Sequence, residues 1–253
     1  MFLITGVTGT TGSLVRQLLV DRGVPVRGMT RNPSRADDVF GDFADPESLS
    51  NALNGVTAAY LVTAPESPVP DHDLAFVAAA RQAGVQRIVR LSAIGSGESF
   101  ENEVLAPHHL AADEAVMDSG VEWTVLRPSM FATNMLRTPV FNMTGDAKHG
   151  VIDPADIAAV AVEALVGGHA GRVYELTGPV AMSVPEQAAV LGEVRGAAVE
   201  VVEVDPAVVD PAWRSGVMWA RAGHGARVTD DVSRVLGRPA VGFEQWARGH
   251  ALT

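Results

Sequence analysis

The sequence predicts an α/β fold built on a doubly wound parallel sheet. The first observation is an apolar run without polar alternation, residues 1–4, which is typical of a buried parallel strand. The second is a glycine-rich turn that follows this strand at once. The third is helical spacing of apolar residues over 14–19, which predicts a helix that ends near Gly23. Strand-like and helix-like runs then alternate along the chain, as expected for a parallel sheet covered by helices.

The turn contains Gly6, Gly9 and Gly12 between the first strand and the first helix. This order is the context of a dinucleotide-binding fingerprint and predicts a Rossmann-type sheet. Gly6 permits the tight turn, Gly9 lets the backbone approach a pyrophosphate, and Gly12 lets helix and strand pack closely. The helix that begins near Thr11 turns its free N–H groups toward the phosphates. The alternative is a tight turn without a ligand. The neighbouring residues expected to border the same nucleotide are Thr8, Thr10 and Thr11.

Length and composition limit the functions to consider. The 253 residues suffice for one large α/β domain, or for a domain with a small cap. Cysteine is absent, which excludes disulfides, thiolate metal sites and cysteine nucleophiles. A net charge of -11 without a basic cluster argues against binding to nucleic acid. No apolar run approaches membrane-spanning length and the N-terminus lacks the basic flank of a signal peptide, so we expect a cytoplasmic protein without a membrane partner.

The second strand, residues 25–29, leads into a loop that contains Arg31 and Arg35. A site that prefers NAD usually has an acidic residue here, which accepts the ribose hydroxyl groups. A guanidinium group instead suits the 2′-phosphate of NADP. The sequence therefore predicts NADPH as the cofactor, with solvated loop arginines as the alternative.

The carboxyl ends of the next two strands supply further candidates for nucleotide contacts. A weak third strand over residues 39–43 places Phe43 against an adenine ring and Asp42 within reach of its amine. Asp45 precedes Pro46 and reads as a helix cap. The fourth strand, residues 57–62, ends in residues that we expect beside the cofactor, because strand ends line the ligand crevice of such a sheet. These residues are Thr63, Ala64 and Pro65.

The fifth and sixth strands lead to the predicted acceptor pocket. Ser92 follows the fifth strand, residues 87–91. The sixth strand, residues 122–126, is followed by Pro128, which we expect at the cofactor. Residues 95–106 form an acidic loop that acts either as a lid or as a solvated surface segment. The residues expected to bind substrate are Met130, Phe131 and Asn134.

Motifs in the same order occur in atypical short-chain dehydrogenase/reductases. They are residues 5–12, Arg31-Asn32-Pro33, residues 41–45, Ser119-Gly120, Leu126-Arg127-Pro128 and residues 153–158. Over nearly its whole length the chain most resembles the NmrA-like NAD(P)H-binding group, which includes quinone reductases and imine-reducing enzymes. The resemblance implies a single domain over residues 1–253. Its Rossmann core covers about 1–130 and 150–178, and a small discontinuous C-terminal substrate-covering part covers about 131–149 and 179–253.

The sequence departs from this superfamily at the proton donor. Typical members use a Tyr with a Lys four residues on, whereas Ala64 and Gly178 follow the two tyrosines of this chain at that spacing. By resemblance, His109 falls at or near the donor position, and a histidine can donate a proton near neutral pH. Asp113 lies on the same helical face and could orient it. Ser92 completes the candidate catalytic set, and we expect no metal. The alternative is that His109 merely begins a helix.

Loss of the Tyr–Lys pair argues against simple alcohol dehydrogenation. Reduction of a quinone, an imine or an activated alkene depends mainly on placing the nicotinamide against the acceptor in a dry pocket. The leading hypothesis is thus an NADPH-dependent oxidoreductase that transfers hydride to a small, apolar, electron-poor substrate. The alternatives are a non-catalytic NAD(P)-binding redox sensor and a non-redox isomerase or cyclase. The sequence leaves open the substrate and the choice between a monomer and a homodimer.

Overall fold

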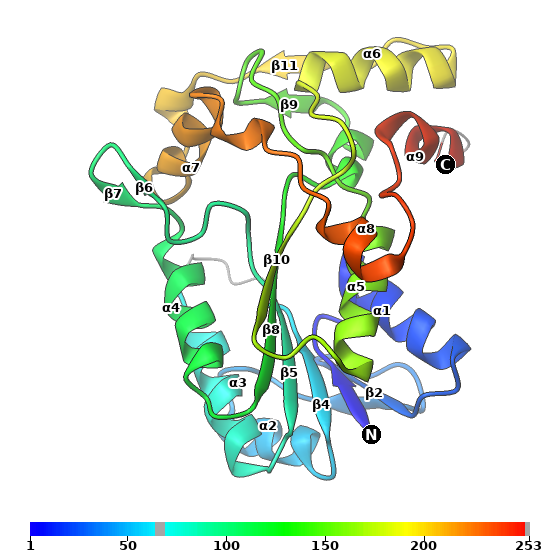
Figure 1. Cartoon of the computed structure of the whole chain (residues 1–253), viewed down its shortest axis with the longest axis vertical. Helices are drawn as coiled ribbons and strands as arrows, with labels where there is room; N and C mark the ends of the chain where they lie inside the picture. Colours follow the sequence, from blue (N-terminus) through cyan, green and yellow to red (C-terminus); the bar gives the residue numbers. More distant parts are fainter. Residues whose placement is uncertain (64–68, 251–253) are drawn as a thin grey trace. The chain divides into compact units, whose positions relative to one another are not determined.

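The computed structural model describes residues 1–63 and 69–250, and these residues contain a seven-stranded, mainly parallel sheet (Figure 1). The pairs β1–β2, β1–β4, β2–β3, β4–β5 and β5–β8 are all parallel. The predicted α/β fold of Rossmann type is confirmed. In spatial order the strands are β10 (Arg172–Leu176), β8 (Glu122–Pro128), β5 (Arg87–Leu91), β4 (Ala58–Leu61), β1 (Phe2–Ile4), β2 (Val26–Thr30) and β3 (Asp38–Phe40).

The strand order reverses at β1, which lies between β2 and β4. The chain first builds outward through β2 and β3, then returns to the other side of β1 and continues through β4, β5 and β8. In doubly wound sheets a ligand crevice opens at such a reversal, outside the carboxyl ends of the strands. Thr5 joins these ends, because its Oγ1 donates to the carbonyl of Val62 at 2.9 Å and accepts the Val62 N–H at 2.8 Å.

Helices cover both faces of the sheet (Figure 1). One face carries α1 (Thr10–Asp21) and α5 (Pro154–Val166), and the other carries α2 (Pro46–Leu53), α3 (Asp71–Gln82) and α4 (Pro107–Met117). The second face buries a cluster that includes Leu53, Phe76 and Val116. Each such side chain contributes about 1.5–3 kcal/mol when it is fully buried. Asp45 caps α2 as predicted, since its carboxylate accepts the N–H groups of Glu47 and Ser48.

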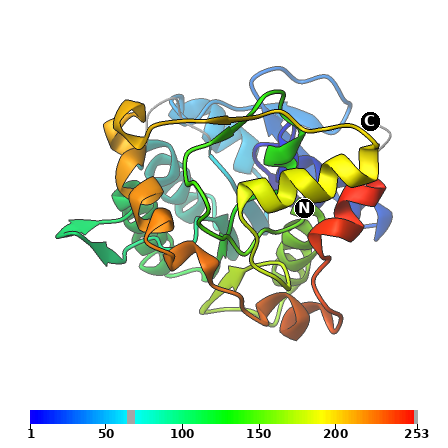
Figure 2. The same ribbon diagram turned by 90° about the horizontal axis from the view of Figure 1, so that it is seen from above.

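The chain forms two compact units. The first comprises residues 1–93, 107–127 and 157–174, and the second comprises residues 94–106, 128–156 and 175–253. In the second unit, α6 (Val184–Arg195) and α9 (Phe243–Gly249) lie side by side in both views (Figures 1 and 2) and share an apolar cluster with Leu191 and Trp246. Ser183 and Glu186 form a capping box at the start of α6.

Two features of the second unit were not predicted. A short strand, β9 (Val140–Asn142), pairs in parallel with β11 (Val201–Glu203). The acidic loop contains a hairpin of β6 (Ser99–Phe100) and β7 (Glu103–Val104), with the two turn residues between them in the left-handed region. The remaining elements are α7 (Pro211–Arg221), α8 (Asp231–Leu236) and the 3₁₀ helices η1 (Ala132–Leu136), η2 (Pro206–Val208) and η3 (His224–Ala226).

The hairpin segment packs within its own unit. The indole N–H of Trp219, on α7, donates to Glu98 at 3.2 Å, and Arg227 pairs with the same carboxylate at 2.8 Å. Leu105 joins Trp219 in a small apolar cluster. These contacts anchor the base of the hairpin, and its role as a lid stays a prediction.

Candidate functional site

The glycine turn after β1 is defined by close backbone packing. Gly6 has a φ of 55°, in the left-handed region, and a Cβ there would lie 2.6 Å from Cγ1 of Val62. A Cβ on Gly12 would lie 2.3 Å from the carbonyl oxygen of Gly6, so only glycine lets α1 approach the turn this closely. The N–H of Gly9 donates to the same carbonyl at 2.8 Å. The steric roles expected of Gly6 and Gly12 are therefore present.

The N-terminus of α1 has the features of an anion site. Gly9 is its N-cap in an extended conformation, and no side chain of the described residues caps the helix. Thr8 and Thr10 are exposed beside the turn. The first N–H groups of α1 are thus available to a ligand, and the helix dipole favours a negative charge at this end. These residues fit a dinucleotide pyrophosphate.

Thr11 has a different role from its neighbours. Its side chain is buried, and its Oγ1 accepts a hydrogen bond from the hydroxyl of Tyr60 at 3.0 Å. Burial raises the pKa of the Tyr60 phenol well above its usual value. This phenol therefore stays protonated and joins β4 to the start of α1, rather than serving as an acid.

A group that we call the loop cluster, Arg16, Asp37 and Asp38, shapes the loop after β2. Arg16 of α1 pairs with Asp37 and, at 2.8 Å, with Asp38. The other carboxylate oxygen of Asp38 accepts the backbone N–H groups of Ser34 and Arg35, each at 2.9 Å. Burial alone would raise the pKa of Asp38, but these N–H groups and Arg16 hold it below its usual value.

The side chains of Arg31 and Arg35 are exposed on this loop. Within residues 1–63 and 69–250, neither guanidinium group has an ion-pair partner. The loop cluster therefore fixes the backbone of the segment and leaves both cations available to a phosphate.

The residues predicted around the adenine ring make contacts of their own. Phe43 stacks on His72 with ring centroids 5.5 Å apart, so the protein itself covers one face of the Phe43 ring. One oxygen of Asp42 accepts the N–H of Ala44 at 2.9 Å. Two further predicted residues, Ala64 and Pro65, lie outside the described residues.

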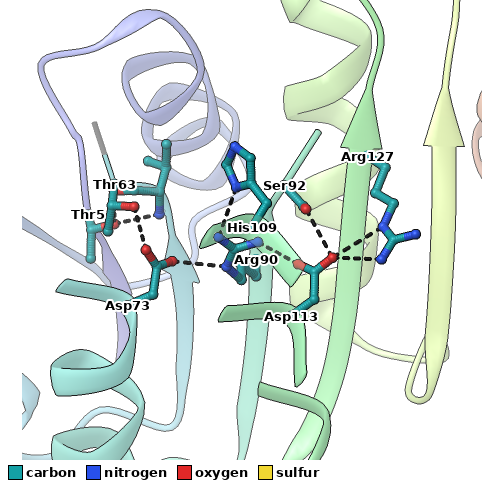
Figure 3. Close-up of polar contacts among 9 residues, drawn as sticks. Thr5, Thr63, Asp73, Arg90, Ser92, His109, Asp113 and Arg127 are labelled. Atoms are coloured by element: carbon teal, nitrogen blue, oxygen red, sulfur yellow. Dashed lines mark hydrogen bonds and ion pairs between the residues drawn. The ribbon is translucent and has the colours of Figure 1, made fainter. Parts of the chain in front are cut away.

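A second group of charges lies inside the first unit (Figure 3). Arg90 of β5 is 1% exposed. Its Nε donates to Asp73 at 2.9 Å, its Nη1 donates to Asp113, and its Nη2 donates to Nδ1 of His109 at 3.1 Å. We call Asp73, Arg90 and Asp113 the central cluster. Both carboxylates are buried, so the arginine is fixed from two sides and directed at His109.

Polar neighbours complete the hydrogen bonding of the central cluster (Figure 3). Asp113 accepts from Ser92 Oγ at 3.0 Å and from Arg127 Nη2 at 2.8 Å. Thr63 Oγ1 donates to Asp73 at 2.7 Å. Four of the predicted site residues, Thr63, Ser92, His109 and Asp113, thus belong to one network.

The structure corrects one expectation for His109 and indicates its charge state. Among the described residues no hydrogen bond joins it to Asp113, because Arg90 of the neighbouring strand lies between them. Burial lowers the pKa of His109 to about 3, and the nearby Arg90, His108 and Arg127 act in the same direction. The ring is therefore neutral near pH 7, and its expected role as proton donor stays a prediction.

Sequence reasoning missed Asp73, Arg90 and Arg127 as members of the site. Arg90 carried a signal, since it is a charged residue in an otherwise apolar strand ending, Ile88 to Leu91. A buried charge in a central strand requires partners, and that requirement points to a site.

Four predicted residues belong to the second unit. Pro128 is buried at the end of β8, and Met130 packs against the apolar cluster of that unit. Phe131 forms an isolated bridge with Ile152, and Asn134 is exposed in η1. Their contacts with cofactor or substrate stay predictions.

Comparison with known proteins gives the family. Residues 6–166 match the family described as NAD(P)H-binding. The chain belongs to this family. The match extends over the glycine turn, the loop cluster and the central cluster, and it confirms both the predicted family resemblance and a nicotinamide nucleotide as the cofactor.

Relatives and solved structures agree with this membership. The chain is 36% identical to (4-alkanoyl-5-oxo-2,5-dihydrofuran-3-yl)methyl phosphate reductase of Streptomyces griseus, over 99% of this chain and 98% of the relative. It is 32% identical to an NAD(P)H azoreductase of Xenophilus azovorans, over 99% and 98% of the two chains. It resembles the structure of the Escherichia coli quinone oxidoreductase QOR2 complexed with NADPH, with a TM-score of 0.81, 26% identity and full coverage of both chains.

These findings support the predicted class, an NAD(P)H-dependent oxidoreductase. No helix among the described residues is long and apolar enough to cross a membrane.

Proposed function

We propose that this protein is an NADPH-dependent reductase that transfers hydride to a small, apolar, electron-poor acceptor. The classes of acceptor are quinones, azo compounds, imines and activated alkenes. The observation that carries the proposal is the glycine turn with the uncapped N-terminus of α1, in the same unit as the polar network that ends at His109. The names of the relatives, which include a butenolide phosphate reductase and an azoreductase, support this range.

The glycine turn and the loop after β2 would hold the phosphate groups of the nucleotide. The N–H groups at the start of α1 bind the pyrophosphate. Arg31 and Arg35 bind the 2′-phosphate, for which the loop cluster leaves their side chains exposed. We infer from these two cations a preference for NADPH over NADH.

The protein's part in the reaction is positioning and polarisation. The bound nicotinamide supplies the hydride. The network from Thr63 through Arg90 to Ser92 forms a polar surface beside the ends of β4 and β5, and Arg90 connects it to the imidazole of His109. Met130, Phe131 and Asn134 are proposed to contact the acceptor and exclude water. A site of this kind accelerates transfer by holding the donor and the acceptor in contact.

The test is NADPH oxidation with a panel of benzoquinones, azo dyes, cyclic imines and enones. We expect acceptor-dependent oxidation of NADPH with at least one class, and slower oxidation of NADH at equal concentration. Tight binding of NADPH and NADP⁺ without any turnover would contradict the proposal and favour a redox sensor, which the missing Tyr–Lys pair of the sequence also allows.

A further inference from the structure

We propose that Arg90 holds His109 as the neutral tautomer that carries its proton on Nε2, and that this N–H donates a hydrogen bond to the acceptor. The substrate class then narrows to uncharged acceptors whose oxygen or nitrogen gains an electron pair, such as quinones, enones and azo compounds. Cationic iminium ions are disfavoured. This inference rests on the proposed function for its substrate class, and on geometry alone for the tautomer.

The tautomer follows from the chemistry of the two side chains. A guanidinium group has five N–H donors and no acceptor. The 3.1 Å contact between Arg90 Nη2 and His109 Nδ1 is therefore a hydrogen bond only if Nδ1 accepts it. A neutral imidazole that accepts at Nδ1 has its proton on Nε2. Figure 3 shows the second ring nitrogen on the side of the ring away from Arg90.

Arg90 is restrained in this position. Its Nε and Nη1 donate to Asp73 and Asp113, which lie on α3 and α4. Both aspartates have further partners in Thr63, Ser92 and Arg127. The guanidinium plane is thus fixed by carboxylates from two helices, and only Nη2 remains to meet the histidine. Arg90 acts as a positioning residue, through His109.

The surrounding charges favour the neutral ring. Arg90 of β5 and Arg127 of β8 are positive, and His108 on the same helix has its ring centroid 4.4 Å from that of His109. Asp73 on α3 and Asp113 on α4 are negative, but their hydrogen bonds in the described structure go to arginine and hydroxyl groups and not to His109. A cationic His109 would therefore lie beside the positive charge of Arg90, and no carboxylate of the described residues would be hydrogen-bonded to it.

The reaction balances without a proton from the histidine. Hydride, with its electron pair, adds to one atom of the acceptor, and the adjacent π electrons move to its oxygen or nitrogen. The nicotinamide leaves oxidised, as NADP⁺. The anion that forms accepts the hydrogen bond from His109 Nε2, and solvent water then supplies its proton. A neutral imidazole N–H is able to polarise a carbonyl in this way. An iminium acceptor develops no anion, so it gains nothing from this donor.

The first experiment is ¹⁵N NMR of histidine-labelled full-length protein with NADP⁺ bound. His109→Gln identifies the signal by its loss. The expected result is the neutral pattern with the proton on Nε2, unchanged from about pH 5 to about pH 8. A proton on Nδ1, or titration near the ordinary histidine value of about 6.5, would overturn the tautomer.

The second experiment compares a benzoquinone with an N-alkylated cyclic iminium ion as acceptor. We expect the quinone to be preferred by wild type, and His109→Ala to lower its kcat/KM about 100-fold, as for loss of one oxyanion donor. His109→Gln retains an N–H donor and restores part of this loss. The substrate class would be overturned if wild type reduced the iminium ion faster than the quinone and His109→Ala left kcat/KM for the quinone unchanged. Turnover of neither acceptor would instead contradict the proposed function, and the NMR result would still decide the tautomer.

Discussion

In the described part of the first unit, Arg16 and Arg90 each pair with two aspartates. The two groups differ in the hydrogen bonds that the remaining carboxylate oxygens accept. In the loop cluster, Asp38 uses its second oxygen for the backbone N–H groups of Ser34 and Arg35. In the central cluster, the second carboxylate oxygens of Asp73 and Asp113 accept hydrogen bonds from the side chains of Thr63 and Ser92. The loop cluster therefore stabilises a loop that presents exposed cations, and the central cluster supports the neutral ring of His109.

The comparison shows that a buried ion pair is better understood as a positioning device than as a source of stability. Replacing a complete buried pair with apolar groups is often neutral, whereas removing one partner leaves an uncompensated charge. Substitutions in the two clusters should thus change different measured properties. The central cluster should affect folding and hydride transfer, and the loop cluster should affect the choice of nucleotide.

The largest expected effect is that of Arg90→Met on stability. The change leaves Asp73 and Asp113 buried without their shared cation and should lower the free energy of unfolding by about 3–5 kcal/mol. Urea denaturation measures it. Arg248→Ala, which removes an exposed pair with Glu244, is the matched control and should cost less than about 1 kcal/mol. Equal losses in the two variants would contradict a special role for burial.

Arg31→Ala should have the next largest effect, on NADPH binding. Loss of one charge-assisted contact to the 2′-phosphate should raise the Kd for NADPH about 10- to 100-fold. The Kd for NADH should stay within about twofold, because NADH lacks that phosphate. Calorimetric titration with both nucleotides measures the ratio. A parallel loss of NADH binding would mean that Arg31 supports the loop rather than the phosphate.

Lower pH should destabilise the protein through His109. The folded-state pKa of about 3 lies below the ordinary value of 6.5, so between these values the unfolded chain binds a proton that the folded chain does not. Stability should fall as pH drops below about 6.5, by up to about 1.4 kcal/mol per pH unit for this group. His109→Gln should remove about 2 kcal/mol of the change between pH 6.5 and pH 5. The same pH dependence in both proteins would show that His109 titrates normally.

The smallest effect is expected for Asp38→Asn, which keeps the shape of the side chain and weakens its bond to Arg16. The loop should loosen, and discrimination between NADPH and NADH should fall about 3- to 10-fold. The ratio of the two Kd values is the readout, and Asp21→Asn on the exposed face of α1 is a control. An unchanged ratio would separate the loop cluster from nucleotide choice.

The sequence predicted the parts of the fold that are determined by residues close together in the chain. The run from Met1 to Gly12 specified strand, turn and helix, because the apolar run, glycine spacing and helical period are contiguous. The hairpin at Ser99–Val104 was missed because its two strands have only two residues each and pack against the distant Trp219. The strand Val140–Asn142 was missed because it is short and its pairing partner, Val201–Glu203, is distant in sequence. The sequence also failed to indicate Asp73, Arg90 and Arg127. These residues and Asp113 are far apart in the sequence, and no local period brings them together.

The most direct test is single-turnover reduction of a benzoquinone by bound NADPH, followed from about pH 5 to about pH 8. If His109 is a neutral donor held by Arg90, NADPH is consumed and the rate constant stays flat across the ordinary histidine range. A rate constant that falls as pH rises through about 6.5 would identify a cationic acid and contradict the neutral ring. Absence of any turnover with NADPH bound would contradict the reductase itself.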